Sequence, residues 1–311
     1  MASAHTSSAL SRRSFVKLSL TGSLVAATGF PFRAAYGAAE DAPEVWILNG
    51  SDRRELMQQA CRIIRDNGGL GPQVKTLSLK INSAWARKPE VGANTHPALV
   101  NEFIKQCKSA DVSEVVLPEN PCDNPRWAFT RPGTKEAVED AGGELINLRD
   151  QKNSFREQNI PDGKSLKNAQ VAKQFFETDT VINMPVAKHH GGTGLTIGMK
   201  NWMGAVKDRG FWHRNNLHQC IADFTSLLKA DWTIVDATTF MPDSGPKGPS
   251  SNLKEPEKLI VSRSPVAADA VTASKVAGKS PSDVGFLRHA QEMELGVIDV
   301  NAMNIHRVEV G

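Results

Sequence analysis

The chain has 311 residues, with 37 Lys and Arg against 34 Asp and Glu, so its formal net charge is +3 at pH 7. The first 37 residues contain four basic residues and no acid, which leaves 33 basic against 34 acidic residues in the rest. This balance argues against a nucleic-acid-binding surface, because such a surface needs a clustered excess of positive charge.

The first 37 residues have the pattern of an export signal. Residues 11–17 hold the adjacent Arg12 and Arg13, then Phe15 and Lys17, as is typical of a twin-arginine signal. Residues 18–30 are apolar but too short and too diluted by Ser, Thr and Gly to span a membrane stably. Small residues at 35–39 fit a cleavage site near 37–39. An ordinary N-terminal helix and an uncut anchor are the alternatives.

A cleaved twin-arginine signal predicts both a partner and a location. We expect the twin-arginine translocation machinery to be a partner, and residues 40–311 to reach the periplasm already folded.

No other apolar run approaches membrane length, so we expect that the processed protein is not an integral membrane protein. The four cysteines form no C-x-x-C pair, which argues against an iron–sulfur motif in this chain.

Residues 40–311 alternate short apolar runs with amphipathic stretches. Residues 51–66 begin with a Ser-Asp cap and place Leu56, Ala60 and Ile63 on one face, which predicts a helix. Further helices are predicted at 97–107, 134–141, 166–176, 216–230 and 265–277. Strands are predicted at 45–48, 74–81, 112–117, 144–148, 179–184, 232–236 and 259–262. Residues 151–164 are predicted to be irregular.

This alternation predicts a single α/β domain with a mostly parallel sheet flanked by helices. Ligands of such sheets bind at the carboxyl ends of the strands, so the residues that follow strands are the candidates for a site. They include Asn82, Glu119 and Asp236, each at or just beyond the end of a predicted strand. Lys80 lies at the end of one of these strands and can reach the same place.

The densest polar run follows the predicted strand 179–184. After Pro185 we expect a polar loop with Lys188, His189, His190 and three glycines, and a second polar pair, Lys200 and Asn201, comes soon after. Glycines permit close backbone approach to a ligand, and lysines add positive charge, so the run favours a carboxylate or phosphate ligand. The alternative is a solvated, glycine-rich surface loop.

Histidines in this region also raise the possibility of a metal site. Four of the eight histidines lie between positions 189 and 218, and neutral imidazole suits divalent transition metals. The candidate ligands are His189, His213, His218 and Asp236. Their spacing is less specific than that of an H-E-x-x-H motif.

The order of these motifs resembles the uncharacterised bacterial and archaeal family called domain of unknown function 362, over about residues 80–296. In that family a strand ends in Pro and is followed by Lys and His, a Thr, Lys-Asn and Gly. Here the matching residues are Pro185, Lys188, His189 or His190, Thr196, Lys200, Asn201 and Gly204. Arg209, Asp236 and the stretch 265–270 match later motifs, whereas Ile81 departs from a Lys-Pro-Asn-like string.

The resemblance implies little about activity. Members are often fused or adjacent to ferredoxin-like iron–sulfur domains, which implies redox or metal chemistry by association and a separate iron–sulfur protein as a partner. We expect an exported enzyme, metal-dependent or redox-linked in some versions, that acts on a small anionic substrate. The alternative is a periplasmic metal- or anion-binding protein without turnover.

The residues expected in the site divide into two groups besides the metal ligands. The predicted catalytic residues are Lys188, His189, His190 and Lys200. The predicted substrate-binding residues are Lys80, Asn82, Thr196, Asn201 and Arg209.

Overall fold

The computed structural model describes residues 42–311, apart from the side chain of Lys152. The predicted export signal lies outside these residues. Within them, no helix is both long enough and apolar enough to cross a bilayer.

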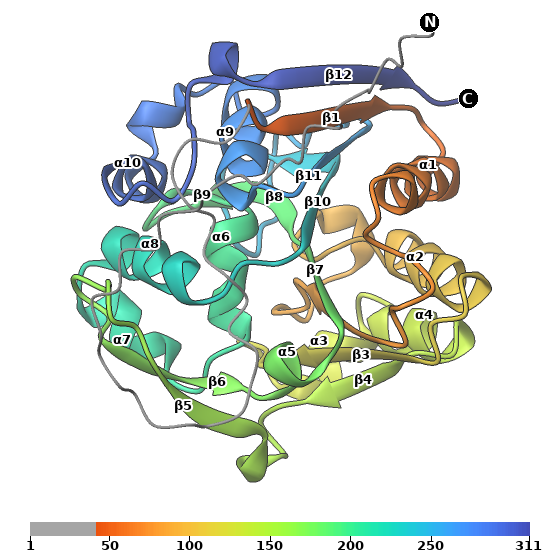
Figure 1. The fold of residues 1–311 in the computed structure, drawn as a ribbon, viewed down its shortest axis with the longest axis horizontal. Helices are drawn as coiled ribbons and strands as arrows, with labels where there is room; N and C mark the ends of the chain where they lie inside the picture. The colour runs from red at the N-terminus through yellow and green to blue at the C-terminus, as the bar shows by residue number, and fades with distance from the viewer. Residues whose placement is uncertain (1–41) are drawn as a thin grey trace, which may run out of the picture. The chain divides into compact units, whose positions relative to one another are not determined.

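A mixed, mostly parallel sheet forms the centre of the described domain, as the sequence predicts (Figure 1). Its main path runs β12-β1-β11-β10-β7-β2-β3-β4. The strands of this path are β1 (Glu44–Asn49), β2 (Thr76–Ile81), β3 (Glu114–Glu119), β4 (Glu144–Asn147), β7 (Thr180–Met184), β10 (Trp232–Met241), β11 (Lys258–Ser262) and β12 (Asn304–Glu309). Neighbours from β4 to β10 are parallel, and β11 runs antiparallel between β10 and β1.

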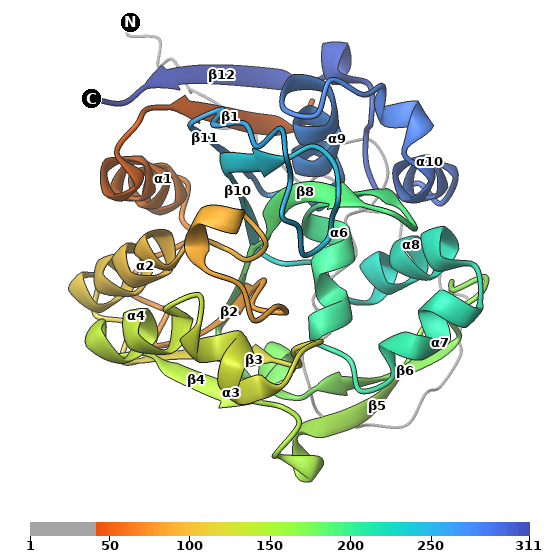
Figure 2. The same cartoon turned by 180° about the vertical axis from the view of Figure 1, so that it is seen from behind.

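Helices cover both faces of this sheet (Figures 1 and 2). On one face lie α1 (Arg53–Asp66), α2 (Pro97–Ser109) and α4 (Thr134–Asp140), whose apolar side chains form one buried cluster with the sheet. On the other face lie α6 (Gly198–Asn201), α8 (Leu217–Leu227), α9 (Pro265–Lys275) and α10 (Gly285–Glu292), which share a second cluster. Shorter helices are α3 (Pro125–Thr130), α5 (Gln174–Glu177) and α7 (Arg209–Arg214).

Local sequence explains where the longer helices begin. Asp52 accepts hydrogen bonds from the backbone N–H groups of Arg54 and Glu55 at 2.7 and 3.1 Å, which caps α1. Helix α2 begins with a proline, and the ring of His96 accepts from the N–H of Ala98 at 3.3 Å. These signals are local, so the predicted starts of both helices agree closely with the structure.

The predicted helix 166–176 is wrong. Residues Asn168–Ala172 form strand β6, and only Gln174–Glu177 are helical. Strand β6 pairs antiparallel with β5 (Phe155–Asn159), which lies in the stretch predicted to be irregular. Ala169 and Val171 are buried on either side of exposed Gln170, and this alternation of period two is the pattern of a strand.

The segment after Pro185 is also more regular than the predicted loop. Val186–His190 form β8, which turns back through β9 (Gly194–Thr196) as a hairpin. Strand β10 continues to Met241, beyond its predicted end, and β8 pairs with this extension. Residues 186–190 are polar enough for a loop, but their hydrogen bonds with β10 hold them as a strand.

Candidate functional site

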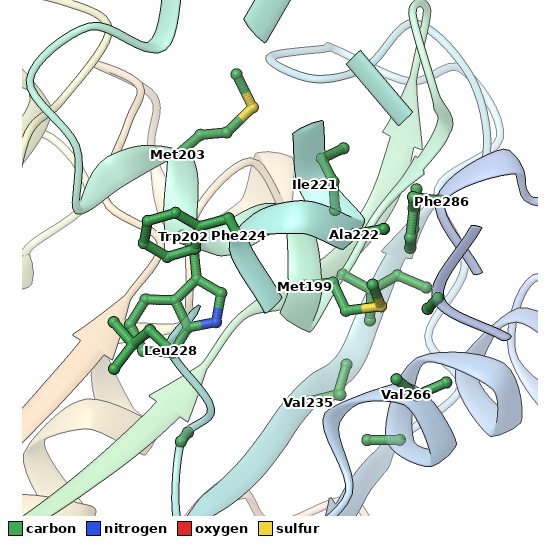
Figure 3. Packing of buried hydrophobic residues seen from close by; sticks show 14 of the residues in the cluster. Met199, Trp202, Met203, Ile221, Ala222, Phe224, Leu228, Val235, Val266 and Phe286 are labelled. Carbon is green, nitrogen blue, oxygen red and sulfur yellow. The ribbon is translucent and has the colours of Figure 1, made fainter. Parts of the chain in front are cut away.

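Residues 198–204 form two short helical turns, α6 and the 3-10 turn Trp202–Gly204, with two different faces. Met199, Trp202 and Met203 belong to the buried cluster shown in Figure 3, where they lie near Phe224. The ring of Trp202 packs 6.2 Å from that of Phe224, centroid to centroid. Because residues three and four apart share a helical face, this packing turns Lys200, Asn201 and Gly204 to the opposite side.

Asp269 of α9 fixes the start of these turns. Its two carboxylate oxygens accept hydrogen bonds from the backbone N–H groups of Gly198 and Met199, at 2.8 and 2.9 Å. Burial raises the pKa of Asp269 to about 7, although both hydrogen bonds act in the opposite direction. Asp269 therefore supplies the hydrogen bonds that the N-cap residue of α6, Ile197, cannot make with its own side chain, and it holds the backbone that carries Lys200.

Three asparagines connect the turns to the ends of the central strands. The amide of Asn201 donates to Oδ1 of Asn183 on β7 at 2.8 Å and to the carbonyl of Lys80 on β2 at 3.2 Å. Asn82, just after β2, donates to Oδ1 of Asn201 at 3.1 Å. All three side chains are buried, so this network holds the turns rigidly against the carboxyl ends of β2 and β7.

Lys80 is paired inside the protein with Glu119, the last residue of β3. The two charged groups lie 2.9 Å apart, and each side chain is only 1% exposed. Burial lowers the pKa of Lys80, and the charge of Glu119 opposes that shift. The backbone N–H of Ser83 also donates to Glu119, at 3.2 Å. A side chain at Gly204 would place its Cβ 2.1 Å from Glu119 Oε1, so only glycine leaves room for the pair.

Lys188 and Lys200 lie near this pair without a carboxylate of their own. We call Lys80, Lys188 and Lys200 the lysine cluster. Burial, reinforced by the charge of Lys200, lowers the pKa of Lys188 to about 7. Lys188 donates to Oδ1 of Asn82 at 3.2 Å and to the carbonyl of Ala93. Lys80 and Lys188 are thus held by asparagine and backbone oxygens and by one carboxylate, that of Glu119, which is bound to Lys80.

Lys200 differs from the other two lysines. It is 8% exposed, and within residues 42–311 its ammonium donates no hydrogen bond. Burial lowers the pKa of Lys200 to about 8; the charge of Cys122 opposes that shift and Arg209 adds to it. Lys200 therefore carries a nearly buried positive charge with no partner that the described residues supply.

His190 and His213 lie beside Lys200. Their rings stack with centroids 6.1 Å apart, and His190 Nδ1 accepts the N–H of Gly192 at 3.0 Å. Burial, followed by the charge of Lys200, lowers the pKa of His190 to about 3, so the ring is neutral at pH 7. Since Nδ1 accepts, the neutral ring carries its hydrogen on Nε2 and offers a donor there.

Arg209 shapes the loop beside the cluster. Its guanidinium donates to the carbonyls of Asn120 and Pro121, both at 2.8 Å, and to Cys122 Sγ at 3.2 Å. A further bond reaches Oδ1 of Asn120 at 3.0 Å. These bonds occupy the guanidinium, so Arg209 positions the loop more than it holds a ligand.

Two predicted site residues take other places. His189 follows Lys188 along β8 and therefore points to the opposite face, where its Nδ1 accepts the N–H of Gly245 at 3.2 Å. Thr196 faces Lys188 across the hairpin, but its hydroxyl is buried and has no partner in the described part of the chain. The structure brings seven of the predicted site residues together, namely Lys80, Asn82, Lys188, His190, Lys200, Asn201 and Arg209.

The four predicted metal ligands are not brought together. No group of three or more His, Cys, Asp and Glu side chains among residues 42–311 could hold a metal ion. Asp236 accepts from the backbone N–H of His96 at 2.9 Å and from Thr238, and the ring of His218 stacks on Phe286. Alternation along β8 turns His189 away from His190 and His213.

A hollow of about 350 Å³ lies elsewhere, between β6 and α7, where Lys207, Phe211 and Trp212 contribute to its wall. None of the predicted site residues lines it. Its wall includes β6, which the sequence did not predict.

Some contacts that build the site were not predicted from the sequence. Asn183 stands inside an apolar strand, and a polar residue in such a place needs a buried partner, which was the available signal. Asp269 lies within the motif at 265–270, but its contact with the start of α6 is not visible in the sequence. Cys122 and the pairing of Glu119 with Lys80 had no signal, because they depend on contacts between distant parts of the chain.

Comparisons with known proteins find a matching family model, one protein that is similar over part of its sequence, and one partly similar solved structure. The model of a family described as "Domain of unknown function (DUF362)" matches residues 78–274. A thylakoid-associated protein of Synechocystis sp. is 27% identical over 93 residues, which are 27% of this chain and 29% of that protein. The lactate racemase apoprotein from Thermoanaerobacterium thermosaccharolyticum shares 15% identity at a TM-score of 0.42, over 68% of this chain and 54% of that one. The chain thus spans less than a third of the curated relative and about half of the solved structure.

Proposed function

This chain belongs to the DUF362 family, and we propose that its lysine cluster binds a small anionic substrate on which the protein acts as an enzyme. The observation that supports the proposal is Lys200, a nearly buried ammonium with no partner among residues 42–311. An unpaired charge in such a place is costly, and a ligand carboxylate or phosphate would compensate it.

The groups around Lys200 are hydrogen-bond donors and cations, which favour an anionic ligand. His190 presents a neutral Nε2–H donor, and Lys188 and Arg209 add positive charge. Glu119 is the carboxylate of this cluster and is already bound to Lys80, so the site has more cationic groups than carboxylates. Positive charge in surroundings of low dielectric attracts an anion strongly, and the donors can orient it.

A metal-dependent version of this enzyme finds no support in the residues present. The described part of the chain offers no cluster of three His, Cys, Asp or Glu side chains that could bind a metal ion. The second candidate is an anion-binding protein without turnover, which Lys200 supports equally. A redox-linked version with a separate iron–sulfur protein as its partner stays a proposal that rests on family association alone.

Anions are expected to stabilise the protein through Lys200. In thermal unfolding of the full chain, phosphate or malonate should raise the free energy of unfolding by about 2.7 kcal/mol at 100 times the Kd, beyond the effect of NaCl at equal ionic strength. Lys200→Met should lose this response yet unfold no more easily without anions, because it removes an unpaired buried charge.

Lys105→Met is the matched control, since Lys105 is an exposed lysine on α2. It should keep the full response to anions. An equal response in wild type and Lys200→Met would refute the anion site. Product formation from a bound anion would separate the enzyme from the binding protein.

We also propose that the protein acts in the periplasm after twin-arginine export. Replacing both Arg12 and Arg13 by lysine should leave the protein in the cytoplasmic fraction, whereas the wild type should appear in the periplasmic fraction. Immunoblots of the two fractions measure this. Equal distributions of the wild type and the variant would contradict the proposal.

A further inference from the structure

Lys200 has the features of a nucleophile as well as those of an anion ligand. Lys200 as a residue is 8% exposed, and no residue between 42 and 311 accepts the hydrogens of its amino group. Asp269 and Asn201 hold the turns around it at both ends. A nearly buried side chain on a backbone held in this way loses little freedom when its amine forms a bond.

We propose that Lys200 forms a Schiff base with a small anionic carbonyl compound, such as a 2-oxo acid, and that the substrates of the site belong to this class. The inference rests on the proposed anion site. The anionic group would lie near the Nε2–H of His190, and the carbonyl carbon would face the Lys200 nitrogen.

The other two lysines are less suited to this reaction. The ammonium of Lys80 is bound to Glu119, and that of Lys188 donates to Asn82 and to the carbonyl of Ala93. Attack on a carbonyl requires a neutral amine, and burial lowers the pKa of Lys200 to about 8, so a useful fraction is neutral near pH 7.5. Lys200 combines access, freedom from partners and a readily lost proton.

The reaction is balanced without any oxidant or reductant. The neutral amine attacks the carbonyl carbon, and the carbonyl oxygen leaves as water, with one hydrogen from the amine and one proton from solvent. The nitrogen keeps its second hydrogen as an iminium ion. That cation draws electrons from the neighbouring carbon, which favours loss of a proton or of carbon dioxide there.

Reductive trapping tests the proposal. The full chain is incubated at pH 7.5 with pyruvate and sodium cyanoborohydride, and its peptides are analysed by mass spectrometry. Lys200 should gain the pyruvate-derived mass at least ten times faster than exposed Lys105, and faster still when the pH is raised through about 8. Acetone, the same methyl ketone without the carboxylate, should show no such preference.

Lys200→Arg and Lys200→Met should both lose the selective adduct and melt as folded proteins. Modification of Lys200 at the rate of Lys105, or an adduct that persists elsewhere in the site in both variants, would overturn the proposal. If anions stabilise the wild type but Lys200 gains no adduct, the anion site stands and the Schiff base falls. If anions have no effect either, both fall.

Discussion

Replacing Glu119 by alanine is expected to lower the free energy of unfolding by about 3–5 kcal/mol. The change leaves Lys80 buried with no opposite charge, since their two charged groups lie 2.9 Å apart at 1% exposure. It also removes the acceptor of the Ser83 N–H. Urea unfolding at pH 7, followed by fluorescence, measures the loss.

Two further variants separate the charge from the packing. Glu119→Gln keeps the shape and an acceptor, so its loss should be smaller. The double variant Lys80→Met, Glu119→Leu removes both charges and should recover most of the stability, as apolar replacements of buried ion pairs often do. A Glu119→Ala protein within 1 kcal/mol of the wild type would show that the pair does not hold these strands together.

Stability is expected to rise between pH 7 and about 10, on the order of a few kcal/mol, because of Lys188 and Lys200. Their pKa values in the folded protein are about 7 and about 8, against 10.5 for an ordinary lysine. In that window the unfolded chain binds more protons, so the free energy of unfolding increases with pH. Below pH 7 both states are protonated, and the destabilisation is fully present.

The measurement is the difference between the wild type and the double variant Lys188→Met, Lys200→Met, which cancels the titration of surface groups. The free energy of unfolding of the wild type should increase relative to that of the double variant as the pH rises from 7 to 10. Asp269 contributes with the opposite sign at lower pH: its pKa is raised from 3.8 to about 7, so stability present at pH 4 is lost towards pH 7. A difference between the two proteins that stays constant from pH 7 to 10 would contradict the assignment.

Much of the fold follows from local pattern. Apolar runs bounded by polar residues gave the central strands, and caps such as Asp52 gave helix starts, because both signals lie within a few residues. Strand β6 was not predicted, because the alternation of its five residues is too short to outweigh the helical pattern of the stretch around them. Its partner β5 lies in a polar stretch that carries no strand signal of its own.

The sequence indicates which residues meet at the site, but not the direction in which each side chain points. Parallel strands end at one edge of the sheet, so Lys80, Asn82 and the segment after β7 had to meet there. The side on which each residue stands depends on whether β8 is a strand, since adjacent residues of a strand point apart. Without β8, His189 and His190 are equivalent candidates, yet only His190 joins Lys200.

The two faces of residues 198–204 also limit how this region can vary in length. Each added residue in a helix rotates everything after it by about 100°, so a one-residue insertion before Lys200 within the turns would move Asn201 to the place of Trp202 near Phe224 and bring Met203 to the place of Gly204 at the site. The tip of the β8–β9 hairpin has no such constraint, because a side chain at Gly191 would meet nothing within 4 Å. Related chains should therefore gain or lose residues at the hairpin tip and keep a fixed count from Gly198 to Gly204.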